Sequence, residues 1–130
     1  MSLRVLAMNH SDTSGGAARA AYRVHNAVRQ LGIDSILRVN QKALFDATVE
    51  GPSTVFGRLL AKFYSGMGQL LIKPFKGNRN IYQSIALMPT RWAARLQHSS
   101  HDVIHMHWIN GEMLSIADIG KIQKPLVWTM

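Results

Sequence analysis

Apolar and polar positions follow one another along this chain in blocks that predict strands and helices in alternation. Residues 3–8 form a short apolar run, which indicates a buried strand, and a polar loop that ends in Gly15 and Gly16 follows it. Apolar side chains then recur at helical spacing over residues 17–31, and Gly32 is placed to end that helix. Residues 35–39 form a second apolar run. This order predicts a βαβ unit with parallel strands.

The middle of the chain holds a strong helical pattern. Residues 41–53 are polar and mixed, and residues 54–72 then carry an apolar stripe opposite a polar, basic one. Thr54 is the expected N-cap of this helix and Pro74 its expected end. The apolar stripe comprises Phe56, Leu59, Leu60, Phe63, Met67, Leu70 and Leu71. Two interpretations stay open: the helix packs on the sheet and leaves a solvated basic face, or it contacts an anionic membrane surface.

The last third of the chain continues the alternation. The pattern predicts a short helix within residues 89–97 with Thr90 as its cap, a strand over residues 102–107, a short helix over residues 114–122 and a buried strand over residues 126–129. Asp118 is expected on a helix surface. Together these elements predict an α/β fold, a Rossmann-like parallel sheet with flanking helices, in one domain over residues 1–130. We expect this domain to be incomplete, because the chain stops directly after a strand that reads as buried.

Composition narrows the class of protein. With 47% apolar and 17% charged residues, the 130-residue chain has the composition of a globular protein. It has no cysteine, which excludes a disulfide scaffold, a thiolate metal site and a cysteine nucleophile. No apolar run approaches the ~20 residues of a membrane-spanning helix, and the amino terminus does not have the pattern of a signal peptide. A cytoplasmic protein is therefore expected.

The charge of the chain is strongly positive and unevenly distributed. Lys and Arg number 15 against seven Asp and Glu, which gives a net charge of +8. Residues 51–101 contain seven basic residues and no acidic one. Such a field favours phosphates, anionic lipids or nucleic acid as partners. No nucleic acid is expected, because the basic stretch has little aromatic interleaving and no recognisable reading motif.

Gly15 and Gly16 are the first candidate binding residues, because they open a helix directly after a strand and a loop. The amides and the dipole of a helix N-terminus attract anions, and glycine lets the backbone approach a phosphate closely. The loop lacks both the Gly-Lys-Ser/Thr of a P-loop and the G-x-G-x-x-G of a dinucleotide-binding fingerprint. A glycine turn with Ser or Asp capping the helix explains the same residues equally well.

His107 and Asn110 are the second candidates, since they are expected at the carboxyl end of a strand, where parallel sheets bind ligands. The alternative for His107 is a plain loop residue. His105 shares the side of the strand with His107, and we expect it to be an interior histidine with its hydrogen bonds satisfied. Zinc is not favoured, because no third ligand lies nearby in the sequence. We expect neither a metal nor a cofactor.

Several segments resemble the bacterial family-4 glycosyltransferases of exopolysaccharide and lipopolysaccharide synthesis. Residues 8–25 (MNHSDTSGGAARAAYRVH) resemble the opening of these enzymes, and residues 31–35 (LGIDS) resemble its continuation. Residues 102–111 (DVIHMHWING), together with residues 114–122 and 124–129, resemble a later part of the family's sequence in the same order. Residues 42–91 match only in their basic, amphipathic character.

The resemblance implies a GT-B architecture of two Rossmann-like domains, with this chain as the incomplete amino-terminal, acceptor-side domain. It implies transfer of a sugar from a nucleotide-sugar donor to a glycan or lipid-linked acceptor, with retention of configuration and without a metal. Gly15 and Gly16 would approach the diphosphate of the donor, and Arg19 would lie at the start of the helix behind them. His107, Trp108 and Asn110 would line the cleft near the acceptor.

The sequence departs from the family's pattern after Met130. A motif with His and Asp follows the Trp-Thr strand in these enzymes, and the sequence stops before that motif and before the donor-binding domain. We therefore expect a truncated transferase, inactive alone and with unknown catalytic residues, at the inner face of the cytoplasmic membrane through residues 54–73. The alternative is a basic binding module that docks on an anionic membrane or on nucleic acid without catalysis.

Overall fold

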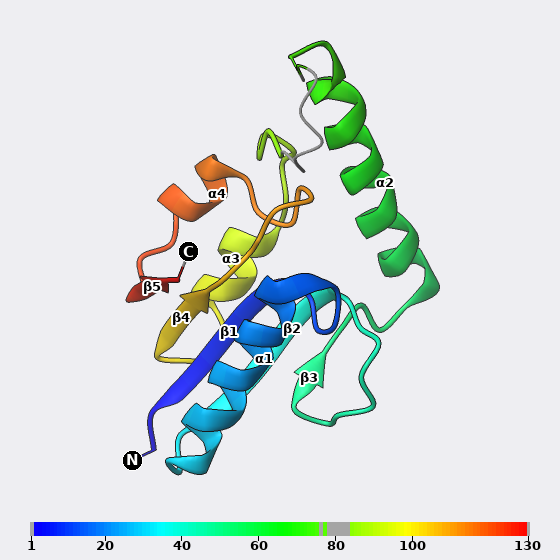
Figure 1. Cartoon of the computed structure of the whole chain (residues 1–130). Coiled ribbons are helices and arrows are strands. Elements are labelled where there is room, and N and C mark those ends of the chain that lie inside the picture. Colours follow the sequence, from blue (N-terminus) through cyan, green and yellow to red (C-terminus); the bar gives the residue numbers. More distant parts are fainter. Residues whose placement is uncertain (1, 76, 78–83, 130) are drawn as a thin grey trace.

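The structure of the protein is a computed structural model that describes residues 2–75, 77 and 84–129. Five parallel strands form one sheet in the order β3-β2-β1-β4-β5 (Figure 1). The strands are β1 (Arg4–Ser11), β2 (Asp34–Gln41), β3 (Val49–Glu50), β4 (Val103–Met106) and β5 (Leu126–Trp128). The helices are α1 (Gly15–Gln30), α2 (Val55–Ile72), α3 (Trp92–Gln97) and α4 (Ile116–Gly120), and the short 3-10 helix η1 (Lys73–Phe75) follows α2. The predicted α/β, Rossmann-like parallel sheet with flanking helices is confirmed.

The central strand β1 separates two apolar cores, because its successive side chains point to opposite faces of the sheet. Ala7 lies with Leu37, Val39 and Val49 in the smaller core, against which Tyr22 of α1 packs. Leu6 and Met8 lie in the larger core on the other face. That core also holds Leu96, Ile104, Met106, Ile109, Met113 and Leu114, and Trp92 of α3 and Ile119 of α4 pack against it. The sheet is thus covered by α1 on one face and by α3 and α4 on the other.

The first third of the chain confirms the predicted βαβ unit and changes its limits. β1 extends to Ser11, so Asn9 and His10 belong to the strand and not to the loop in which the pattern placed them. The helix begins at Gly15, two residues earlier than predicted. His25 of α1 is buried, with its ring nitrogens 2.9 Å from Ser35 Oγ and 2.9 Å from Thr48 Oγ1. The short strand β3 was not predicted within the polar residues 41–53.

α2 is the predicted helix, and its orientation decides against one of the two interpretations of its apolar stripe. Thr54 caps it as predicted, since its hydroxyl accepts a hydrogen bond from the Gly57 amide at 2.9 Å. The stripe, however, is turned largely outward: Phe56 and Leu59 are exposed, and only Gly68 and Ile72 of the helix are buried. The interpretation that this stripe packs on the sheet is therefore wrong. Gly68, on the buried side of α2, lets the helix approach Glu112 closely.

Three predictions in the last third of the chain are corrected. Asp118 is buried, not on the surface, because its carboxylate accepts hydrogen bonds from Thr90 Oγ1 at 2.7 Å and from the Ser115 amide at 3.3 Å. Ser115 is the N-cap of α4 and forms a capping box with Asp118. Thr90 is not the N-cap of α3, a position that Arg91 occupies, although its hydroxyl accepts from the Trp92 amide. The predicted buried strand is instead the exposed edge strand β5.

Candidate functional site

The carboxyl ends of β1, β2 and β4 meet at one edge of the sheet and bring polar side chains together there. The register places β1 between the other two strands, so that Met8 lies opposite Arg38 on one side and Met106 on the other. Asn9 and His10 follow Met8, Asn40 lies near the end of β2, and His107 comes directly after β4. This is the edge at which open parallel sheets bind ligands.

Side chains of β1 fix the loop after β4 in place. The side-chain oxygen of Asn9 accepts a hydrogen bond from the Trp108 amide at 2.9 Å, and the His10 amide donates to the Trp108 carbonyl at 2.8 Å. The His10 and Trp108 rings meet edge to face with centroids 5.7 Å apart. Burial lowers the pKa of His10, against an opposing hydrogen bond with the Asn110 backbone. His10, Trp108 and Asn110 therefore form one neutral polar cluster that joins two strand ends.

Gly15 and Gly16 lie at an open helix N-terminus. Gly15 has a φ of +86°, which favours glycine, and a Cβ at either position would meet nothing within 4 Å. The Ser14 side chain does not cap α1, and Ser11 Oγ instead accepts from the amides of Thr13 and Ser14. The Asp12 carboxylate also does not cap the helix, because it accepts from the amides of Ala43 and Leu44 after β2. Neither Ser14 nor Asp12 therefore caps α1, and Gly15 and Gly16 are exposed at its N-terminus.

Arg19 lies one turn into α1. Its side chain is exposed and makes no hydrogen bond or ion pair within residues 2–75, 77 and 84–129. The guanidinium is available to an anion from solvent.

His107 is buried at the end of β4, and it lines neither of the two cavities between the sheet and α2. Its ring centroid is 4.1 Å from that of His105, and its Nε2 has no hydrogen-bond partner among the described residues. Burial, together with the neighbouring His105, lowers the pKa of His107 to about 4. His105 is only partly buried and bonds through Nε2 to Thr129 Oγ1 at 2.8 Å. At neutral pH His107 is an uncharged imidazole.

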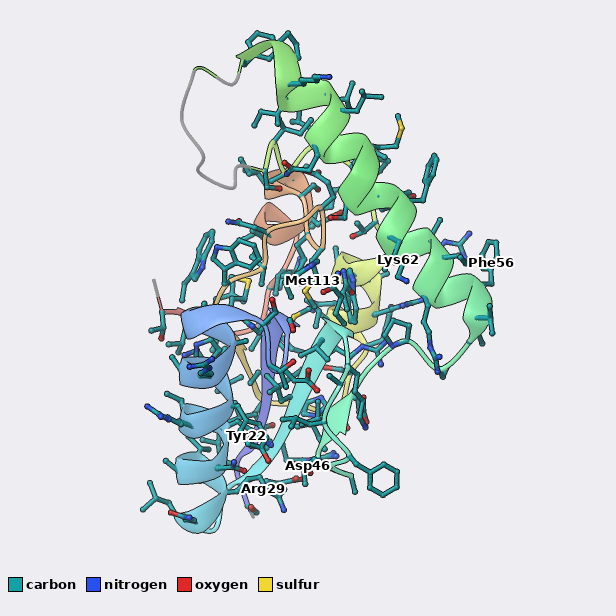
Figure 2. The ribbon with its side chains drawn as sticks, turned by 45° about the vertical axis from the view of Figure 1, so that its right-hand side comes forward. Tyr22, Arg29, Asp46, Phe56, Lys62 and Met113 are labelled. Atoms are coloured by element: carbon teal, nitrogen blue, oxygen red, sulfur yellow. The ribbon has the colours of Figure 1, made fainter. Side chains whose placement is uncertain are left out.

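A cationic cleft of about 710 Å³ opens between the ends of β1 and β2 and the first turns of α2. His10, Asn40 and Gln41 line it from the sheet, and Lys42, Arg58 and Lys62 supply three cations. None of its lining residues is Asp or Glu. The remaining lining residues are Ala43, Leu44, Gly51, Pro52, Ser53 and Ala61. Figure 2 shows Lys62 on the side of α2 that is turned toward the sheet.

The three cations differ in how far the protein already satisfies them. Lys42 Nζ donates to the carbonyls of Asp46 at 3.0 Å and of Val49 at 2.6 Å, which leaves one of its three N–H groups for a ligand. Arg58 and Lys62 are exposed and have no hydrogen-bond or ion-pair partner in the described part of the chain. Two uncompensated cations facing one hollow attract an anion, and phosphate is the group that such side chains bind best.

A second cavity of about 730 Å³ adjoins this cationic cleft, since both are lined by Asn40, Pro52, Ser53 and Ala61. Its walls are more aromatic, with Phe56, Tyr64 and Trp92 among the lining residues. The guanidinium groups of Arg38 and Arg95 lie over the Trp92 ring, 5.3 and 5.5 Å from its centroid. Rings and cations side by side can pack against a sugar or a second anionic group.

The structure separates the sequence candidates into two groups at the same sheet edge. Trp108 and Asn110 lie beside His10, whereas Gly15, Gly16 and Arg19 lie on and behind the open N-terminus of α1. Sequence reasoning missed His10, Asn40 and Lys42, and it treated Arg58 and Lys62 as members of a basic face rather than of a cleft. The acid-free stretch of residues 51–101 was a signal for Arg58 and Lys62, whereas nothing in the local pattern pointed to His10, Asn40 or Lys42. No group of three potential His, Cys, Asp or Glu metal ligands occurs among the described residues.

Comparisons of the chain with protein-family models, with curated proteins and with solved structures find no match. Within the described residues, no helix has the length and apolar character needed to cross a membrane.

Proposed function

We propose that this protein is the acceptor-side domain of a glycosyltransferase that takes its sugar from a nucleotide-sugar donor and acts in exopolysaccharide or lipopolysaccharide synthesis. The observation that carries the proposal is the cationic cleft at the carboxyl edge of the Rossmann-like sheet, where Arg58 and Lys62 have no partner among the described residues and no carboxylate belongs to the lining. Its supports are the residue patterns around Gly15–Gly16 and His107–Asn110, which resemble those of the family-4 enzymes.

The ligand of the cationic cleft is a phosphate-bearing glycan or lipid-linked acceptor. Arg58, Lys62 and the free N–H of Lys42 neutralise the phosphate, while the Asn40 and Gln41 amides can bind sugar hydroxyls. His10 also lines this cleft, so its ring borders the same ligand. The open amides of α1 at Gly15 and Gly16 would approach the diphosphate of the donor, as the resemblance implies.

Binding at the cleft is tested by titrating the ¹⁵N-labelled chain with inorganic pyrophosphate and with a sugar 1-phosphate. Saturable shifts of the His10, Asn40 and Gln41 amides are expected. The double variant Arg58→Gln/Lys62→Gln should lose at least about tenfold in affinity, because two charge-assisted contacts disappear. Arg23→Gln removes an exposed cation on α1 and is the matched control. Equal affinities for the two variants, or no saturable binding, would overturn the role of the cleft.

The transferase part of the proposal is tested in the DNA that follows the codon of Met130. A reading frame that continues into a His-Asp segment and a second Rossmann-like unit would support the proposal. A stop codon at that position, with no donor domain encoded nearby, would contradict it. Transfer of a labelled sugar by the 130-residue chain alone would contradict the expectation that catalysis needs the donor domain.

A further inference from the structure

α2 carries a broad apolar face that no other part of the described structure covers. Val55, Phe56, Leu59, Phe63 and Leu70 are each between 59% and 74% exposed, and Phe75 extends the exposed face beyond the helix. Figure 2 shows Phe56 on the side of α2 that points away from the sheet. The helix is 18 residues long, so this outward apolar face runs for about 27 Å. An exposed apolar face of that size on a protein surface marks a site of contact with another protein or with a membrane.

The charges on the same helix are all positive. Lys73 follows its last turn, and Arg58 and Lys62 lie around the helix from the outward apolar face. Neither α2 nor any residue between 51 and 101 is acidic. The potential of an anionic lipid surface reaches about 8 Å into solution at physiological salt, which is comparable with the diameter of a helix. All three cations therefore lie within the field of a lipid surface that α2 touches.

We propose that α2 docks this protein on an anionic lipid surface, with Leu59, Phe63 and the rest of the outward apolar face inserted at the boundary between headgroups and acyl chains. Aromatic and Leu side chains on one side and cations on the other are the composition of helices that lie in a membrane interface. A second copy of the chain fits this face poorly, because a symmetric pair of α2 helices would bring like charges together without any acidic partner.

Docking through α2 also has a consequence for the cationic cleft. Arg58 and Lys62 line that cleft from the helix that touches the lipid. The cleft therefore lies one helix diameter, roughly 10 Å, from the lipid surface, close enough for a phosphate-bearing acceptor anchored in that surface to reach it. The docking itself does not depend on the proposed function, since Leu59, Phe63 and Lys73 do not line the cleft.

The proposal is tested by sedimenting the full chain with vesicles of phosphatidylcholine alone and with about one third phosphatidylglycerol. Binding is expected to the anionic vesicles only and should weaken as salt is added. Leu59→Asp/Phe63→Asp should weaken this binding at least about tenfold, and Lys73→Gln about fivefold. Leu31→Asp, at an even more exposed apolar position at the end of α1, is the matched control and should bind like the parent.

Circular dichroism and thermal melting check that each variant folds, as expected for substitutions at exposed positions. Equal binding of Leu59→Asp/Phe63→Asp and Leu31→Asp would overturn the proposal, as would absence of vesicle binding. A concentration-dependent dimer that Leu59→Asp/Phe63→Asp abolishes, without vesicle binding, would assign the face to a second copy. Pyrophosphate binding by Leu59→Ser/Phe63→Ser separates this result from the proposed function, because these substitutions change neither a residue that lines the cleft nor the charge beside it.

Discussion

Gly68 is the residue at which α2 touches the loop after β4. A Cβ at this position would lie 2.5 Å from Glu112 Cγ and 2.8 Å from Glu112 Oε1. Glu112 cannot yield easily, because its carboxylate is buried and accepts hydrogen bonds from Ser84 Oγ and from the amides of Ala86, Leu87 and Met88. Its own φ of 59° lies in the left-handed region, which a non-glycine residue adopts only under tight constraint. Glycine at position 68 is thus required by packing.

Gly68→Ala should therefore destabilise the protein by about 1–3 kcal/mol in urea unfolding, although alanine is the better helix former. Gly66→Ala is the matched control two residues away, since a Cβ there meets nothing within 4 Å. That control should gain up to about 1 kcal/mol of stability from helix propensity alone. Destabilisation of both variants by the same amount would contradict the close contact with Glu112.

His107 should make the free energy of unfolding depend on pH in the acidic range. Its pKa is about 4 in the folded protein and near the ordinary 6.5 in the unfolded chain. Between these values the unfolded state binds the extra proton, so stability rises as pH increases and is lost as pH falls from about 6.5 toward 4. The contribution is roughly 3 kcal/mol at most.

The measurement is urea unfolding of the parent and of His107→Gln at several pH values between 4 and 7. His107→Gln should show a smaller slope of stability against pH, whatever its stability at pH 7. The other histidines with lowered pKa values, among them His10 and His25, act in the same direction and leave a residual slope. An unchanged slope in His107→Gln would show that His107 does not stay neutral on folding.

At the scale of elements, α4 is a helix of five residues that its cap must stabilise. Asp118 closes the capping box with Ser115 and also holds Thr90, so one carboxylate ties α4 to the segment before α3. Asp118→Ala should cost about 2 kcal/mol in urea unfolding, because the cap and a buried hydrogen bond are lost together. Lys121→Ala, at the exposed end of the same helix, should change stability by less than about 0.5 kcal/mol. Similar losses of stability in Asp118→Ala and Lys121→Ala would contradict a stabilising role of the Ser115–Asp118 capping box.

Most elements could be predicted because each carries its own local signal. Gly32 after α1 and Thr54 before α2 are such signals, and the structure confirms both helices. The orientation of α2 could not be predicted in the same way. Helical periodicity identifies the most apolar side as the buried one, but α2 buries the side of Gly68, whose missing side chain adds nothing to that pattern and permits close approach to Glu112.

At the scale of the whole molecule, the cationic cleft could not be predicted from the sequence. Lys42 belongs to the segment after β2, whereas Arg58 and Lys62 belong to α2, and only the path of the chain between them brings the three cations around one hollow. His10 joins them from β1. The local pattern could indicate a basic stretch, but not which of its members face one another.

β5 leaves an open edge on the sheet. Leu126, Val127 and Trp128 are 37–51% exposed, and β5 pairs with β4 on one side only within the described residues. An exposed apolar edge strand is a template for pairing with another chain. We therefore expect the protein to associate as its concentration rises.

Val127→Lys should reduce this association in sedimentation velocity, because a charge on the edge opposes pairing with a second strand. The substitution should change the free energy of unfolding by less than about 1 kcal/mol, since Val127 is half exposed. Leu31→Lys places the same charge at an exposed apolar position far along the chain and should associate like the parent. If Leu59→Asp/Phe63→Asp, rather than Val127→Lys, abolishes association, the contact runs through α2 and not through the sheet edge. Charged substitutions in β5 and in α2 thus show which of these two exposed apolar surfaces carries the association.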